Sequence, residues 1–289
     1  MFKQLSKKKR ILLIIGASVA VLTVITVVLF AVVRYNSMRG TCGDNLTWVY
    51  DGKGTLTISG TGNMDNYEVI PSNRPEWEQF RNEITTVEIE YGVTSIGEYA
   101  FSTQAGAHQI GYNDSLTDVD IPESITNIGA GAFYGCNSLK DIAIPASVSQ
   151  MGRSVFYYCS DLTTVILKGR ITSIEGTTFI GCSSLTSIIL PNTITSIGTS
   201  AFRDCTNLTS ITIPEDVTVI EMGAFANCSS LNDIVFQGDA PILKYPDSIT
   251  SNWIFDGVTA NAYYPPNNKT WDGYKAGYLG GDITWIALP

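Results

Sequence analysis

Three residue types recur together every 23 positions along the middle of the chain. The leucines of this pattern are Leu116, Leu139, Leu162, Leu185, Leu208 and Leu231. The phenylalanines are Phe133, Phe156, Phe179, Phe202 and Phe225, and the cysteines are Cys136, Cys159, Cys182, Cys205 and Cys228. A period between about 20 and 50 residues is the mark of a solenoid, in which each unit buries its apolar side against its neighbours. The pattern therefore predicts a stack of similar coils.

Each unit contains two short extended segments and a turn. In the unit that begins at Leu139, the first segment ends at Pro145, because proline has no N–H to donate to a central strand. A second extended segment follows over residues 148–152, and Phe156 to Cys159 closes the unit with a tight, helical turn. The side chains expected to point into the core are Leu139, Ile142, Ile144, Val148, Met151, Phe156 and Cys159. The predicted fold class is a β-rich solenoid with a parallel sheet and short helical turns.

The repeats begin before their spacing becomes regular. The segment from Ile84 to Phe101 matches the unit that begins at Leu116, but an insertion over about residues 102–115 follows it. This insertion replaces the expected cysteine and contains His108, the single histidine of the chain. Full units are expected to start at Ile84, Leu116, Leu139, Leu162, Leu185 and Leu208, and a degenerate one at Leu231. We therefore predict that the repeats span residues 84–236.

The N-terminal residues combine a basic start with a long apolar run. Residues 1–10 include a Lys-Lys-Lys-Arg cluster, and residues 11–33 carry no charge. At about 1.5 Å per residue, a helix over this run is long enough to cross a bilayer. We expect an uncleaved transmembrane signal anchor, with residues 1–10 in the cytoplasm and the repeats outside the cell membrane. A cleaved signal peptide is the alternative, although no small-x-small cleavage site follows the run.

The regions on either side of the repeats are predicted to be caps. Residues 46–50 and 55–59 alternate apolar and polar positions around a Gly-containing turn, which indicates a β-hairpin. Residues 75–81 predict a short helix that starts with proline. A juxtamembrane segment and an N-terminal cap would thus take residues 34–83, and the C-terminal cap residues 237–289. All five tryptophans lie in these flanks, either as cap cores or as a carbohydrate-stacking surface.

The charge of the chain excludes one class of partner. Residues 1–39 hold seven of the 18 basic residues and none of the 27 acidic ones, so the rest of the chain is strongly acidic. Such a surface repels a phosphate backbone, and we expect no nucleic-acid partner.

Few residues offer catalytic or metal-binding chemistry. The cysteines repeat once per unit at one orientation, which predicts buried free thiols and not disulfides. One histidine cannot supply a two-histidine zinc site, and no phosphate-binding Gly-rich loop is present. We predict no cofactor, no metal and no catalytic residue. A carbohydrate-active enzyme is a distant alternative, because the many carboxylates allow acid pairs.

The full repeat pattern resembles the BspA-like leucine-rich repeat family of bacterial surface proteins. Residues 182–202 carry it as Cys-Ser-Ser-Leu-Thr-Ser-Ile-Ile-Leu-Pro, followed by Ile194-Thr-Ser-Ile-Gly and Ala201-Phe202. The flanks at residues 40–48 and 264–285 are also similar to the usual ends of the family. The chain departs from the pattern at Lys168 and Gln237, which replace proline, and at Glu175 and Glu221, which replace glycine. The resemblance implies a surface-exposed or secreted protein, with adhesion among the activities of its members.

Positions beside the inward residues of the first strand of each unit are expected to face outward and form the outer face of the sheet. They are acidic in the early repeats and apolar in the middle ones. The candidate partner-binding residues are Glu88, Asp118, Asp120, Asp141, Thr164, Ile166, Ser187, Ile189, Thr212 and Val235. The alternative is that Ile and Val stand there because they favour strands. The loop over residues 102–115 is a second possible binding surface.

These observations favour a membrane-anchored extracellular leucine-rich-repeat protein that recognises a protein or cell-surface ligand, with adhesion as one form of that role. A structural or sensing ectodomain of an envelope assembly is the second hypothesis.

Overall fold

The computed structural model describes residues 21–28, 38–68, 73–102, 115–244, 253–266, 268–274 and 279–289. The chain divides into two compact units, Met1–Gly40 and Thr41–Pro289. A helix covers residues 21–28 of the first unit. Within the described ranges, no helix has the length and apolar character needed to cross a membrane. The basic segment 1–10 and most of the predicted span 11–33 lie outside those ranges.

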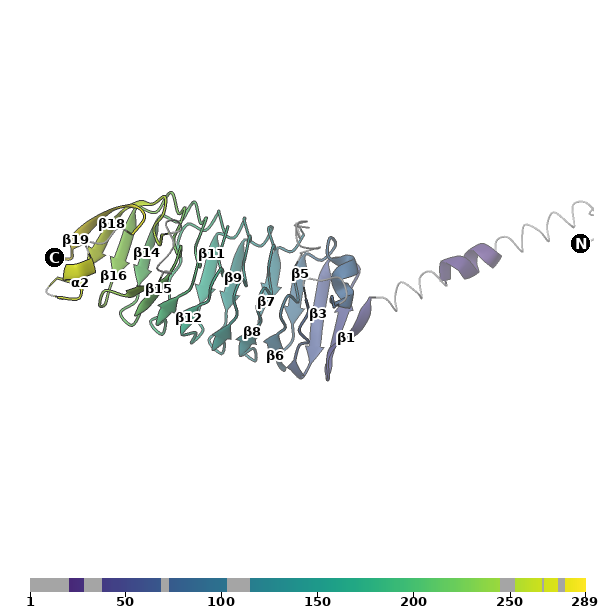
Figure 1. Cartoon of the computed structure of the whole chain (residues 1–289). Coiled ribbons are helices and arrows are strands. Elements are labelled where there is room, and N and C mark those ends of the chain that lie inside the picture. Colours follow the sequence, from purple (N-terminus) through teal and green to yellow (C-terminus); the bar gives the residue numbers. More distant parts are fainter. Residues whose placement is uncertain are drawn as a thin grey trace, which may run out of the picture. The chain divides into compact units, whose positions relative to one another are not determined.

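The second unit is a solenoid in which most coils contribute one strand to each of two rows (Figure 1). The first row contains β5 (Thr86–Ile89), β7 (Asp118–Asp120), β9 (Asp141–Ile144), β11 (Thr164–Leu167), β14 (Ser210–Ile213) and β16 (Asp233–Phe236). The second row contains β6 (Val93–Ile96), β8 (Asn127–Ile128), β10 (Gln150–Met151), β12 (Ser173–Ile174), β13 (Ser196–Ile197), β15 (Val219–Glu221) and β17 (Ile242–Lys244). Strands of successive coils are parallel, which confirms the predicted β-rich, mostly parallel architecture.

Neighbouring coils pair equivalent residues, so the sequence repeat becomes a lateral row of side chains. Thr164 lies opposite Asp141, and Ser196 opposite Val219. Both rows are nevertheless interrupted. The hydrogen-bonded sheets are β1-β2-β3-β5-β7, β9-β11 and β14-β16-β18-β19 in the first row, and β4-β6-β8-β10 and β12-β13-β15-β17 in the second. Residues 187–190, which correspond to β11 one coil later, form no strand.

The core lies between the two rows and along the turn that closes each coil. All seven residues predicted to point inward in the unit at Leu139 are at most 5% exposed. The phenylalanine rings form one continuous stack from Phe101 to Phe255, with neighbouring centroids between 5.2 and 5.7 Å apart. The stack explains why phenylalanine recurs, because each ring buries its faces against the coils before and after it.

The cysteines are free and buried, as predicted. Each repeat thiol donates a hydrogen bond to the carbonyl of the phenylalanine one coil earlier, for example from Cys182 to Phe156 at 3.1 Å. The same bond is made by Cys136, Cys159, Cys205 and Cys228, at 3.0 to 3.4 Å. Burial raises the pKa of the Cys228 thiol to about 12, so these side chains stay protonated and act as weak donors.

The turn that closes each coil differs from the predicted helical turn. In the coil at Leu139, Tyr157 N–H donates to Ser154 O at 3.2 Å and Cys159 N–H to Phe156 O at 3.1 Å. Ser154 and Tyr158 have φ values of 59° and 55°, in the left-handed region. A right-handed helix cannot continue through such residues, and the segment therefore makes successive single turns.

The N-terminal cap contains β1 (Arg39–Gly43), β2 (Leu46–Tyr50), β3 (Thr55–Gly60), β4 (Gly62–Asn63) and the 3-10 helix η1 (Glu76–Phe80). The predicted hairpin is confirmed, since β2 and β3 pair in antiparallel fashion. In addition, β3 pairs in parallel with β5, and β4 with β6. The cap thus supplies a coil of its own, in which Leu56 and Ile58 lie opposite Val87 and Ile89.

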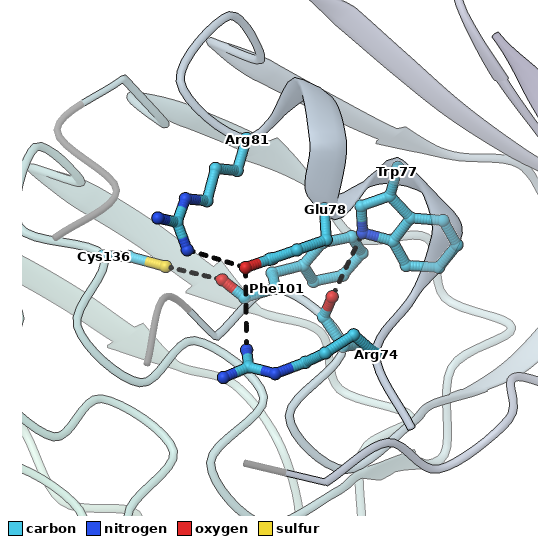
Figure 2. A network of polar contacts seen from close by, with 7 residues as sticks. Arg74, Trp77, Glu78, Arg81, Phe101 and Cys136 are labelled. Carbon is cyan, nitrogen blue, oxygen red and sulfur yellow. Dashed lines mark hydrogen bonds and ion pairs between the residues drawn. The ribbon is translucent and has the colours of Figure 1, made fainter. Parts of the chain in front are cut away.

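The helix η1 closes the end of the phenylalanine stack (Figure 2). Its Trp77 ring stacks on Phe101 at 5.9 Å, and the indole N–H donates to Ala100 O at 3.2 Å. Glu78 lies between two guanidinium groups, 2.7 Å from Arg81 and 3.8 Å from Arg74. The shared carboxylate holds the helix and its flanking residues together, while the Trp77 contacts with Ala100 and Phe101 join the helix to the first coil.

The C-terminal cap contains β18 (Thr259–Tyr264), α2 (Trp271–Tyr274) and β19 (Asp282–Ala287). Both strands extend the first row in parallel, β18 beside β16 and β19 beside β18. Trp271 is buried and its ring lies 4.9 Å from Phe236. Trp48 and Trp77 are likewise buried, which supports the cap-core interpretation for these three tryptophans.

Candidate functional site

Alternate side chains of the first-row strands point away from the core, as expected from the twofold period of a strand. Val87 and Ile89 are buried, whereas Glu88 between them is exposed. We call these outward positions the outer face. Nine of the ten candidate binding residues are exposed there, and Val235 is half-buried. The structure confirms their placement; their role in binding stays a prediction.

Pairing between coils aligns the candidates in two lateral lines. One line runs through Thr86, Asp118, Asp141, Thr164, Ser187, Ser210 and Asp233. The other runs through Glu88, Asp120, Ala143, Ile166, Ile189, Thr212 and Val235. The first line is hydroxyl-rich or acidic, and the second changes from acidic to apolar along the solenoid.

The acidic end of the outer face is formed by β5, β7 and β9. Glu88 lies directly opposite Asp120, so two carboxylates stand side by side. Like charges at such a position destabilise a sheet. The ion pairs in the described part of the chain involve Glu78 and Asp204, and none reaches this end. The carboxylates therefore present uncompensated negative charge to solvent.

The apolar part of the outer face lies around Ile166 and Ile189. Their side chains are 48% and 85% exposed. Ile189 belongs to residues 187–190, which lack strand pairing, while its neighbours Ile188 and Leu190 remain buried at 6% and 5%. The coil is thus packed normally on its inner side. An isoleucine this exposed contributes little to packing of the core.

Sequence reasoning missed two exposed apolar residues of the same face. Val49 in the N-terminal cap lies opposite Thr57, and Ile286 lies opposite Tyr263 in the C-terminal cap. Val49 and Ile286 are 46% and 36% exposed. The sequence shows alternating apolar and polar residues in the cap strands, but it does not show that these strands pair with the strands of the repeats. The outer face therefore extends over both caps.

Other candidate sites are less well defined. Residues 103–114 of the insertion, including His108, lie outside the described residues. At the base of the insertion, Ser115 Oγ donates to Asn82 O at 2.6 Å. Across the described ranges, no group of three or more His, Cys, Asp or Glu side chains is arranged to hold a metal ion.

Comparison with known proteins gives one family match. Residues 78–117 and 107–232 match the sequence model described as the BspA type leucine rich repeat region, in six copies. No curated protein matches the chain.

Several solved structures resemble the fold. A leucine-rich repeat protein from Bacteroides ovatus is 20% identical, with 84% of this chain and 76% of that chain covered and a TM-score of 0.43. One from Eubacterium ventriosum is 20% identical, with 87% and 84% covered and a TM-score of 0.36. A leucine rich cell surface protein from Faecalibacterium prausnitzii is 19% identical, with 86% and 99% covered and a TM-score of 0.35. At these low TM-scores the likenesses support no conclusion about function.

Proposed function

Because the chain belongs to the BspA-type leucine-rich repeat family, we propose that its outer face recognises another protein at the cell surface. Proteins of this family typically bind other proteins and are generally not enzymes. The observation that carries the proposal is the pair of exposed isoleucines, Ile166 and Ile189, on neighbouring coils. Exposed apolar groups rimmed by polar ones are typical of interaction sites.

The size of the outer face is compatible with one partner. With the cap strands included, it spans β2 to β19. Strands about 4.8 Å apart and about 15 Å long then give a surface of about 700 Å². A standard interface buries about 800 Å² on each side. A single protein partner could therefore be held by this face together with neighbouring loops.

The location of the protein is part of the proposal. The uncharged run over residues 11–33 would anchor the chain in the cell membrane, and the basic residues before it would stay in the cytoplasm. The repeats would then face outward, where adhesion to another cell or to a matrix protein becomes possible. This part is supported by the sequence of residues 1–39.

Removal of residues 1–39 separates recognition from recruitment into an envelope assembly. If the outer face is the binding site, a fragment that begins at residue 40 should still capture its partner. If the chain is instead a structural or sensing part recruited through its N-terminal segment, the fragment should lose its partners.

The direct test is a pull-down of cell-surface proteins with the wild-type fragment and with Ile166→Asp/Ile189→Asp. We expect the double variant to lose the partner, since two charges would be desolvated at the contact. Ile242→Asp is the matched control, because Ile242 is a 65% exposed isoleucine of the second row. Capture that is equal for all three proteins would refute the outer face as the binding site.

A further inference from the structure

Both strand rows are interrupted at the coil formed by residues 162–184, which we call the hinge coil. Its first-row strand β11 pairs with β9 of the preceding coil, and the next coil has no strand at residues 187–190. Its second-row strand β12 pairs with β13 of the following coil and not with β10. In strand pairing, the hinge coil is therefore joined to the preceding coil in the first row and to the following coil in the second row. On either side of the unpaired second-row strands, Arg170 N–H still donates to Val148 O at 2.8 Å and Ser154 N–H to Gly176 O at 3.2 Å.

The missing bonds between β10 and β12 can be identified from the intact coils. In those coils, a second-row N–H donates to the carbonyl 23 residues earlier. Examples are Ser149 to Thr126 at 3.0 Å, Thr195 to Thr172 at 2.8 Å and Thr218 to Thr195 at 2.9 Å. The corresponding backbone bond from Thr172 N–H to Ser149 O is absent. The Thr172 hydroxyl also makes no bond to Ser149 O, whereas the hydroxyls of Ser149 and Thr195 donate to the carbonyl 23 residues earlier. Further along, Gly152 donates to Ile128 and Gly198 to Ile174, whereas Glu175 makes no bond to Met151.

Glu175 explains why these bonds are missing. Most coils have glycine at its position, with the backbone close against the preceding coil. A Cβ atom on Gly152 would lie 2.6 Å from Ala130 N, and one on Gly198 would lie 2.6 Å from Gly176 N. Real Cβ atoms do not approach so closely. A side chain at the position of Glu175 therefore requires the two coils to shift locally.

Glu221 occupies the same position two coils later but leaves the pairing intact. Its carboxylate reaches back to the preceding coil and accepts hydrogen bonds from Thr199 N at 3.1 Å and Thr199 Oγ1 at 2.8 Å. The carboxylate of Glu175 instead accepts from Ser173 Oγ of its own coil at 2.6 Å. The side-chain bridge that replaces the backbone contact at Glu221 is thus missing at Glu175.

A polar surface depression of about 520 Å³ lies over β8, β10 and β12, with Gln150, Arg153 and Glu175 in its lining. The turn side of the same coils stays closed. Phe156 and Phe179 stack at 5.5 Å, and the Cys182 thiol bonds to Phe156 O. The coils can therefore separate at the second-row strands, while the ring stack and the first-row pairing of β9 with β11 hold them together.

We propose that the second-row contact held open by Glu175 lets the repeats before and after it rotate relative to one another, about the paired first-row strands β9 and β11 and the phenylalanine stack. Ile166 and Ile189 both follow the open contact, so the rotation changes the orientation of the acidic end of the outer face, on β5, β7 and β9, relative to these two isoleucines. The hinge follows from the second-row contacts alone and does not depend on whether the outer face binds a partner.

Amide hydrogen exchange of the full chain in detergent tests the open contact. We expect the Thr172 and Glu175 amides to exchange at least about tenfold faster than those of Thr195 and Gly198, which have the equivalent hydrogen bonds. The variant Glu175→Gly should slow exchange at residue 172, whereas Glu221→Gly should not slow exchange at the equivalent residue 218, whose N–H already donates to Thr195 O. Equal protection of Thr172 and Thr195 in the wild type, or unchanged exchange in Glu175→Gly, would overturn the proposal.

Spin labels on the second row test the motion itself. Asn127→Cys/Ser196→Cys spans the open contact, and Ser173→Cys/Ile242→Cys spans three fully paired steps. Both pairs cover three coil steps, or about 14 Å, and the six native cysteines are buried away from the label. Dipolar EPR should give a broader distance distribution for the first pair, which Glu175→Gly narrows. Equal widths for the two pairs would contradict a hinge.

Discussion

The turn side of the solenoid and its strand rows follow the same 23-residue repeat but differ in continuity. Stacked rings run without a break from Trp77 in the N-terminal cap to Phe255 in the C-terminal cap. Both strand rows, in contrast, divide into separate sheets. Ring stacking and turn-side backbone hydrogen bonds, such as Phe156 N–H to Thr178 O at 2.9 Å, therefore hold the coils together where strand pairing stops. The outward strand positions are left free to vary.

Among the predicted single substitutions, removal of one ring from the phenylalanine stack should lower the stability of the fold most. Phe179 is fully buried between Phe156 and Phe202, in the hinge coil where strand pairing is weakest. We expect Phe179→Ala to lower the free energy of unfolding by about 3–5 kcal/mol, because the substitution leaves a cavity in the phenylalanine stack. Urea unfolding monitored by circular dichroism measures the loss. Thr212→Ala on the outer face is the control and should stay within about 0.5 kcal/mol of the wild type.

A second prediction concerns the thiols of the same side. Burial raises the pKa of Cys182 well above its ordinary value of 9.0. An acid whose pKa is higher in the folded state stabilises the fold below pH 9 and loses that contribution as the pH rises toward its folded pKa. One such thiol lowers the free energy of unfolding by about 1.4 kcal/mol for each pH unit between 9 and its folded pKa.

The variant Cys182→Ala isolates this effect from other groups that titrate at high pH. Its urea midpoint should fall less steeply than that of the wild type between pH 9 and pH 11. Identical slopes for both proteins would mean that the Cys182 thiol is not buried in the folded state.

A third prediction concerns the left-handed turn positions and should give a smaller effect. Ser200 has φ 54°, at the position where an earlier coil has Gly131 with φ 60°. A left-handed conformation costs a residue with a side chain about 1–2 kcal/mol, part of which the flexibility of glycine offsets. Ser200→Gly should therefore raise the unfolding free energy by up to about 1 kcal/mol. Gly131→Ala should lower it, because the new Cβ meets the Tyr99 ring. Thermal melting of both variants checks the opposite signs.

The repeat made the core predictable. A constant spacing of Leu, Phe and Cys requires equivalent inward positions in every coil, and the structure has them buried. The hairpin of the N-terminal cap was predicted from its alternation and turn residues. The left-handed turns were missed, although Gly131 and Gly135 mark the positions that Ser154 and Tyr158 occupy one coil later. A glycine in one repeat can thus reveal the backbone conformation of another.

The interruptions of the strand rows could not be predicted from the pattern. Glu175 and Glu221 are the same departure from the repeat, and only the direction of each carboxylate decides whether the coils stay paired. That direction depends on nearby hydroxyl and amide donors in three dimensions. The pairing of both caps with the outer face was missed for a similar reason, since cap strands lack the spacing that aligns the repeats.

The central claim is that the outer face plays no part in holding the fold, and its most direct test is urea unfolding of two matched double variants. Ile166→Asp/Ile189→Asp changes two outward positions, and Val165→Asp/Ile188→Asp changes their buried neighbours. We expect the first variant to stay within about 1 kcal/mol of the wild type, and the second to lose more than about 4 kcal/mol or fail to fold. A loss of several kcal/mol in the first variant would contradict the claim, because it would show that these isoleucines hold the fold together.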